Sequence, residues 1–141
     1  MPDSGAIDNA LVAKLGADLA LLALVPDNVY LDEADANAKR FVIVSLVEET
    51  DERRFEGRSH EDARYLVKAV GLSTVTTRAN MREAAARIDA LLDGGTLTVV
   101  GYGLMAMYRE SRLTPQVEVD DLNTAIRWFH RGGIYRVMMS T

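Results

Sequence analysis

The C-terminal stretch RWFHRGGIYRVMMST, residues 127–141, gathers residue types that occur in catalytic and ligand-binding sites. Arginine binds anions, histidine transfers protons or binds metals, and glycine-rich turns can cradle phosphate. A phosphate loop, however, needs glycines at fixed spacing followed by Lys-Ser or Lys-Thr, and a dinucleotide fingerprint needs Gly-x-Gly-x-x-Gly at a helix start. Neither Gly132-Gly133 nor Gly101-Tyr102-Gly103 has such a pattern. We therefore expect structural bends or bulges at both glycine pairs.

The two histidines of the chain, His60 and His130, are poor candidates for a metal or catalytic site. Because there is no cysteine, a zinc ion would need both histidines together with carboxylates. Asp62 is close to His60, but no acidic residue lies within five positions of His130. No serine stands in a Gly-x-Ser-x-Gly elbow, and Asp120-Asp121 fits a turn cap. We expect no enzyme activity, no metal and no cofactor.

Arginines alternate with aromatic residues in the same stretch, a combination that single-strand-binding proteins use to stack bases beside phosphates. The residues concerned are Arg127, Trp128, Phe129, Arg131, Tyr135 and Arg136. Against this interpretation, the chain carries a net charge of −5, whereas proteins that grip nucleic acid show a concentrated basic excess. A small nucleic-acid-binding module that uses the Arg/aromatic C-terminal strand stays as the alternative to a structural role.

Length and composition predict a single globular domain over residues 1–141. The 141 residues are 48% hydrophobic and 26% charged, which suffices for one core. We see no signal peptide and no apolar run long enough for a membrane span. Residues 1–38 contain seven acidic residues and one lysine, while the remainder is nearly balanced. This acidic start is a solvated helix face and loop, or a surface that repels DNA or docks a basic partner.

Two helices are predicted from the hydrophobic periodicity. The first ends before Pro26, and its apolar positions are Ile7, Leu11, Leu15, Leu19 and Leu22. The second begins near Thr77 or Asn80, which are both acceptable caps, and ends at residues 93–95, where a glycine can take the left-handed position. Its apolar face comprises Met81, Ala84, Ala85, Ile88, Leu91 and Leu92.

Apolar segments predict strands over residues 29–31, 41–47, 63–73, 96–109 and 126–140. Residues 48–62 form a charged connector that fits a hairpin with its tip in solvent, and residues 110–125 form a second polar excursion. The element order predicts an α+β domain with a mostly antiparallel sheet of about five strands and two helices packed on one face.

The predicted strands carry apolar residues on both faces. Met105, Met107, Met138 and Met139 add adaptable side chains that fit either an ordinary core or a subunit interface that repacks. Since the helices cover only one face of the sheet, another copy of the chain is a candidate to cover the second.

Taken in order, these elements resemble the tail terminator (tail completion) proteins of long-tailed phages and of phage-derived gene transfer agents. The resemblance covers nearly the whole chain and involves no catalytic signature. It rests on the segments ALVAKLGADLALLALV, DNVYLDEA, RFVIVSLVEE, DARYLVKAVG, AAARIDALLDGGTL and HRGGIYRVMMS. The stretches DALLDGGTLTV and HRGGIYRV carry most of it.

This resemblance implies a structural virion protein. Such subunits assemble as a ring, typically a hexamer, that caps the tail tube, stops its polymerisation and joins the tail to the head connector. The implied partners are further copies of the chain, the tail tube protein and the connector or stopper protein. Genomic DNA would pass through the ring without specific binding, which an acidic surplus suits. The implied location is the tail or neck of the virion, and the host cytoplasm during assembly.

We expect the contacts to neighbouring subunits, tube and connector in the polar segments 48–62 and 110–125 and in the last strand. The candidate protein-interface residues are Arg53, Arg54, Phe55, Arg58, Arg112, Arg131, Tyr135 and Arg136. We also expect Gly133→Val to disrupt the last strand, because a positive φ or a bulge would need the glycine.

Overall fold

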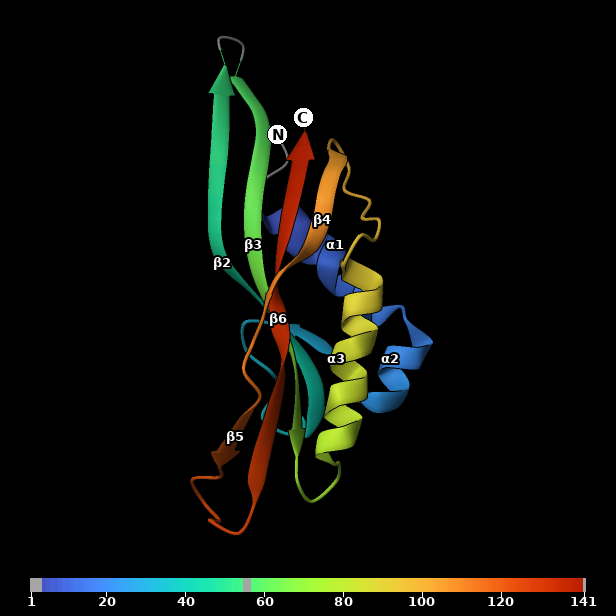
Figure 1. Ribbon diagram of the computed structural model, residues 1–141, viewed down its shortest axis with the longest axis vertical. Helices are drawn as coiled ribbons and strands as arrows, with labels where there is room; N and C mark the ends of the chain where they lie inside the picture. The colour runs from blue at the N-terminus through green and yellow to red at the C-terminus, as the bar shows by residue number, and fades with distance from the viewer. Residues whose placement is uncertain (1–3, 55–56, 141) are drawn as a thin grey trace.

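The computed structural model describes residues 4–54 and 57–140, with side chains over residues 5–48 and 61–140. In this part of the chain, helices and strands follow one another in an elongated α+β arrangement (Figure 1). They are α1 (Ser4–Gly16), α2 (Leu19–Leu24), β1 (Val29–Leu31), β2 (Arg40–Arg54), β3 (Gly57–Leu72), α3 (Arg78–Leu92), β4 (Gly103–Arg112), β5 (Gln116–Val119) and β6 (Arg127–Ser140). The predicted fold class is confirmed, although three helices are described instead of two.

The strands form a mixed sheet in the order β1-β2-β3-β6-β4, and β5 also pairs with β6. Only β1 and β2 run parallel among the described pairs; the others are antiparallel. On one side β6 pairs with β3 from Trp128 to Ser140, and on the other side it pairs with β5 and then with β4. Strand β6 therefore connects β1, β2 and β3 on one side of the sheet to β4 and β5 on the other.

One face of the sheet is covered by the helices. Helix α1 packs against β1 and β2, and α3 packs against β3, β6 and β4. Residues at alternate positions of the strands point into this layer, as the two-residue period of a strand requires. Tyr65 of β3 and Tyr135 of β6 lie opposite each other there and are fully enclosed. They join the aliphatic residues Ile7, Leu11, Leu15, Leu21, Ile88 and Leu92 in the main core.

The prediction of one continuous N-terminal helix was wrong, because the helix breaks between Gly16 and Leu19. Asp18 caps α2 by accepting a hydrogen bond from the backbone N–H of Leu21 at 2.9 Å. The same carboxylate binds the Arg87 guanidinium of α3 through two hydrogen bonds of 2.7 Å. The ion pair and the cap together favour a new helix start at this point.

The long connectors contain more strand than predicted. The hairpin expected at residues 48–62 is confirmed, but β2 and β3 pair through this segment up to Arg54 and Gly57. Strand β4 begins only at Gly103, after a turn in which Gly101 has φ +85°. The bend expected near Gly101 is therefore present, at the start of the strand and not within it.

Strand β6 is continuous, so the predicted bend at its glycine pair was wrong. Its register with β3 runs without a shift through Gly132 and Gly133. The glycines serve close packing instead: a Cβ on Gly132 would lie 2.1 Å from the Val67 carbonyl oxygen, and one on Gly133 would lie 2.7 Å from the Ser111 carbonyl oxygen.

The second face of the sheet is partly covered by the chain itself. The segment that links β1 to β2 folds over this face and packs Ala34 and Ala38 onto a small second core. That core contains Phe41, Val70 and Trp128, and the Phe41 and Trp128 rings meet edge-on at 6.2 Å. A second copy of the chain is therefore not needed to cover this part of the sheet.

Candidate protein-interface surface

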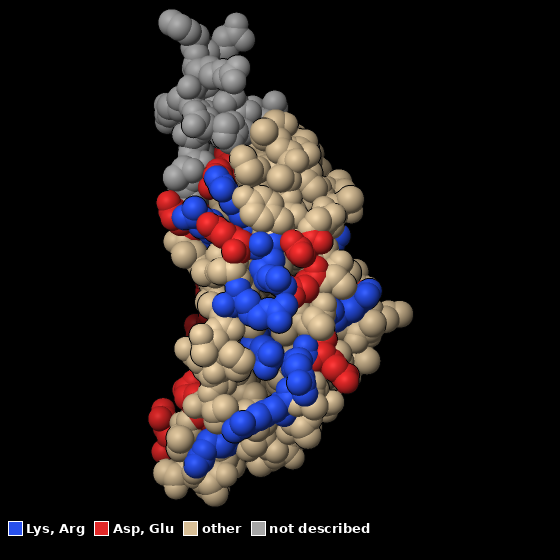
Figure 2. Space-filling model, viewed as in Figure 1, with Lys and Arg blue, Asp and Glu red and all other residues tan. Residues whose placement is uncertain are grey.

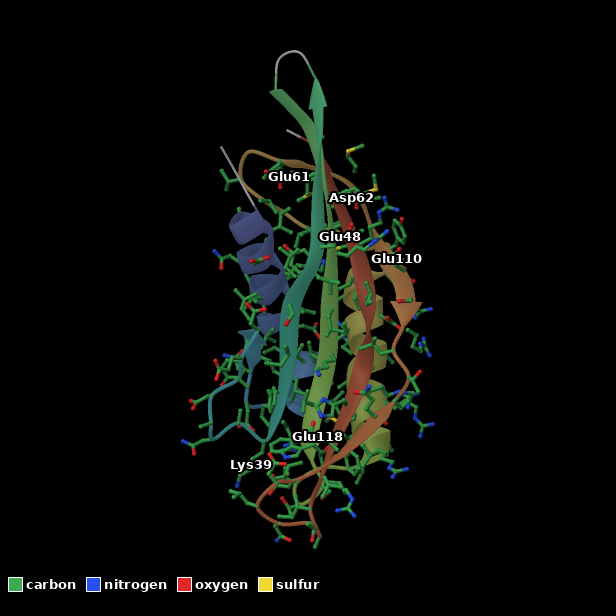
Figure 3. The ribbon with its side chains drawn as sticks, turned by 90° about the vertical axis from the view of Figure 1, so that its left-hand side faces the viewer. Lys39, Glu48, Glu61, Asp62, Glu110 and Glu118 are labelled. Carbon is green, nitrogen blue, oxygen red and sulfur yellow. The ribbon has the colours of Figure 1, made fainter. Side chains whose placement is uncertain are left out.

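Beyond the second core, the second face of the sheet carries a group of charged residues. Arg64 of β3 and Arg136 of β6 face each other in register, which alone would be destabilising. Arg64 binds Glu48 at 2.9 Å and Glu110 at 2.8 Å, so it links β2 to β4 across the sheet. Figure 3 shows Glu48, Asp62 and Glu110 close together along this face. The charge repulsion is thus compensated inside the chain.

Arg136 is one of the predicted interface residues, and its guanidinium is engaged within the chain. It grips both carboxylate oxygens of Asp62, with Nε 2.8 Å from Oδ1, and it donates to the Tyr108 hydroxyl at 3.2 Å. Asp62 and then Tyr108 raise the pKa of the Arg136 guanidinium above its usual range. The planar fork of arginine suits this two-point grip. An interface role for Arg136 stays a prediction, and it would have to act from within this network.

Tyr135, also predicted at an interface, lies on the helix side of the sheet and is 1% exposed. Its hydroxyl donates to Asp89 of α3, and burial together with this carboxylate raises the pKa of Tyr135. Asp89 also binds Arg109 at 2.5 Å and Arg112 at 3.2 Å. Tyr135 therefore ties the sheet to α3 in the core, and its side chain is not available to a partner in this structure.

Arg112 and Arg131, in contrast, line a groove between α3 and the β4–β6 part of the sheet. The first pocket of this groove has a volume of about 90 Å³ and is also lined by Arg82, Asp89 and Gly132. A second pocket of about 180 Å³ shares Arg131 and is lined by Arg78. We call these residues, Arg78, Arg82, Arg112 and Arg131, the arginine groove. Figure 2 shows the basic side chains gathered over α3, β4 and β6.

Sequence reasoning missed Arg78 and Arg82, the two members of the groove on α3. Their spacing of four residues places both on one side of the helix, and this was the available signal. Among the described residues, Arg78, Arg82 and Arg131 form no ion pair. Arg78 instead lies over the Phe129 ring, with 5.6 Å between the guanidinium carbon and the ring centre. The groove is therefore an accessible site of positive charge.

Three of the remaining predicted interface residues, Arg53, Arg54 and Arg58, lie on the paired strands of the β2–β3 hairpin. Phe55 is outside the described residues, and the side chains of Arg53, Arg54 and Arg58 are also outside them. The backbone places these arginines at the far end of the hairpin, which projects beyond the other strands in Figure 1. Their proposed contacts to a partner stay a prediction.

His130 and the aromatic residues of β6 are used inside the chain. His130 Nε2 lies 3.0 Å from Glu118 of β5, and burial, followed by Lys68, lowers the pKa of the imidazole. The Trp128 indole N–H donates to Asp120 at 3.1 Å, which helps to keep the pKa of that carboxyl below its usual range. Together with the Phe129–Arg78 contact, this leaves no row of free rings along β6 on which bases could stack.

Over residues with described side chains, no group of three or more His, Asp or Glu residues could hold a metal ion. Nor does any described helix have the length and apolar character needed to cross a membrane.

The fold is shared with solved structures, while sequence comparison gives no relatives. No protein-family model and no curated protein matches the chain. A chain in the virion of a native gene transfer agent particle is 21% identical, with a TM-score of 0.67; the match covers 98% of the present chain and 97% of that chain. A second solved chain is 13% identical with a TM-score of 0.57, and the match covers 97% of the present chain and 96% of that chain. At these identities the likeness establishes the fold alone.

Proposed function

We propose that this chain is a structural virion protein of a phage or gene transfer agent, and specifically a tail terminator. In this role, copies of the chain form a ring, typically a hexamer, on the end of the tail tube. The ring stops tube polymerisation and presents a surface to the head connector. The protein is located in the tail or neck of the virion, and DNA passes through the ring without specific binding.

The fold match to a chain of the gene transfer agent virion is the observation that carries this proposal. It extends over 98% of one chain and 97% of the other, so the two chains share a complete domain and not a common substructure. The sequence segments that resemble tail terminators lie in α1, α2, β1, β2, β3, α3 and β6, which span this same fold. The long β2–β3 hairpin and the arginine groove supply surfaces for assembly.

A non-enzymatic role agrees with how the polar residues are used. The half-buried acidic residues Asp18, Asp62 and Asp89 bind arginines or tyrosine, and His130 pairs with a carboxylate on the adjacent strand. These contacts fix the positions of helices and strands relative to one another. They leave these polar groups engaged with one another.

Deletion of the gene in its producing strain tests the proposal. Electron microscopy of the particles should then show tails of irregular, excessive length that are not joined to heads. Expression of the wild-type chain from a plasmid should restore tails of uniform length. Tails of normal length joined to heads in the deletion strain would refute a terminator role.

A complementary assay uses purified components. The tail tube protein, allowed to polymerise alone, should give tubes with a broad length distribution, and the added chain should cap their ends. Caps would be visible at one end only, because the tube is polar. Uncapped tubes at saturating concentrations of the chain would contradict the proposed partner.

A further inference from the structure

Among the described residues, three of the four arginines of the arginine groove, Arg78, Arg82 and Arg131, have no carboxylate partner. Asp89 is the acidic residue that lines it, and Asp89 is already bound by Arg109, Arg112 and Tyr135. The floor is made by Ala85, Ala86 and Gly132, whose small size leaves room between the guanidinium groups. A shallow site of this kind, with guanidinium groups around a floor of small residues, suits a short segment rich in carboxylates.

Such a segment exists on this same chain. Asp32, Glu33 and Asp35 follow β1 in the loop that covers the second core, and all three are exposed. We call them the acidic loop. No ion pair of theirs is found within the described part of the chain.

Backbone hydrogen bonds and packing at its two ends fix the position of the acidic loop. The Asp32 N–H donates to the Val44 carbonyl at 2.9 Å, and the Ala38 N–H donates to the Asp35 carbonyl at 3.0 Å. Ala34 and Ala38 pack on the second core beneath it. The carboxylates are thus presented on an ordered loop, which lowers the entropy lost on binding.

The acidic loop cannot reach the arginine groove of its own chain. Strands β1 and β4 are at opposite ends of the sheet order, and Figure 3 shows the β1–β2 loop and β4 on opposite sides of the molecule. Two complementary surfaces at opposite edges produce a head-to-tail contact, which generates a closed ring when the rotation between copies closes.

We propose that the arginine groove receives the acidic loop of a second copy of this chain. The contact between Arg78, Arg82 and Arg131 of one copy and Asp32, Glu33 and Asp35 of the next makes the repeating interface of the assembly. This inference rests on the proposed ring and names the surfaces that form it. The overall charge of −5 favours an acidic protein segment, carried by the chain itself, over a nucleic acid as the occupant.

A charge swap between copies tests the docking. The groove variant carries Arg82→Glu with Arg131→Glu, and the loop variant carries Asp32→Lys with Glu33→Lys. In either variant alone, like charges meet at every interface, so self-association should weaken by about tenfold or more. An equimolar mixture should associate again, because each altered surface then meets its complement in alternating copies. Sedimentation velocity of the purified full chain measures this, with circular dichroism as the check on folding.

Cross-linking gives a second readout that also works on assembled particles. The chain has no cysteine, so Glu33→Cys combined with Arg82→Cys provides one reactive pair per interface. Oxidation or a short bis-maleimide should produce a ladder of covalent multimers. The matched control combines Glu33→Cys with Glu83→Cys, on the neighbouring position of α3, and should produce much less. Absence of the ladder both in solution and in particles overturns the docking.

Other outcomes are equally decisive. Variants that self-associate like wild type, or a mixture no stronger than its components, overturn the proposal. Loss of DNA binding in the groove variant with unchanged self-association would assign the groove to nucleic acid instead. If the gene deletion leaves tails normal while the charge swap behaves as expected, the terminator role fails and the docking stands. If the deletion has the expected phenotype but the groove variant restores normal tails, the docking fails alone.

Discussion

Replacement of Gly132 by alanine should force β3 and β6 apart in the middle of the sheet. The added Cβ would lie 2.1 Å from the Val67 carbonyl oxygen and 2.5 Å from the Lys68 Cα. Both are backbone atoms, so no side-chain rotation relieves the clash. Non-bonded carbon–oxygen contacts begin at about 3.3 Å, and the strands would therefore have to separate locally by roughly 1 Å.

The loss of stability follows from the backbone hydrogen bonds that this separation breaks. Backbone hydrogen bonds hold at about 2.7–3.2 Å between heavy atoms, so about two ladder bonds beside Gly132 would be lost. At about 1 kcal/mol each, and with about 1 kcal/mol for disturbed packing, the free energy of unfolding should fall by about 3 kcal/mol. That is a large part of the roughly 5–15 kcal/mol typical of a domain.

Urea unfolding followed by circular dichroism measures this loss as a lower midpoint at an unchanged slope. Gly94→Ala is the matched control, because Gly94 has φ +75° and no atom within 4 Å of an added Cβ. Its cost should come from the left-handed backbone alone, at about 1 kcal/mol. If Gly132→Ala destabilises no more than Gly94→Ala, the close approach of β3 and β6 at this position is refuted.

The remaining predictions concern the same core and its charges. Gly133→Val should also destabilise the fold in urea titrations, through a clash with a backbone carbonyl of β4 and not through a positive φ. Tyr135→Phe removes the hydrogen bond to Asp89 and should cost about 1 kcal/mol in the same assay. The pKa of Asp18 is lowered below 3.8, chiefly by its hydrogen bond to α3, so its stabilising effect is present at neutral pH and lost as the pH falls through the folded value. The Asp18→Asn variant should therefore be less stable than wild type at pH 7 and should lose less stability on acidification. If the variant loses as much stability as wild type at acidic pH, this role of Asp18 is contradicted. The pKa of the His130 imidazole is lowered below 6.5 in the folded protein, so the imidazole is protonated at a higher pH in the unfolded chain than in the folded one. The free energy of unfolding should therefore fall as the pH drops from 6.5 towards the pKa of His130 in the folded protein. His130→Gln should remove that part of the pH dependence, as thermal melting at several pH values would show.

The features that could be predicted from the sequence are those set by local chemistry. Thr77 caps α3 by accepting from the Asn80 N–H, and Met81, Ala84 and Ile88 are buried at the spacing the periodicity gave. Gly94 takes the left-handed position after the helix. Apolar segments likewise predicted the inner parts of β2 and β3. Each of these features depends on residues that lie close together in the sequence.

The features that could not be predicted depend on partners far along the chain. The break after Gly16 is fixed by the pairing of Asp18 with Arg87, which is 69 residues away. The need for Gly132 arises from the carbonyl of a neighbouring strand and not from its own φ. The arginine groove forms only once α3 is laid against β4 and β6, so two of its four arginines were assigned no role. Periodicity reports burial, but it does not report which surfaces meet.

The pairing of β6 also determines how the domain carries force. Strand β6 is bordered from end to end by β3 on one side, and by β5 and β4 in succession on the other. A pull along β6 therefore loads many backbone hydrogen bonds at once in shear, whereas a pull across it would peel them one at a time. Because all these strands run roughly along the long axis of the molecule (Figure 1), the domain is stiffest in that direction. Tension applied between the β2–β3 hairpin and the opposite end, at β5, is transmitted with little extension.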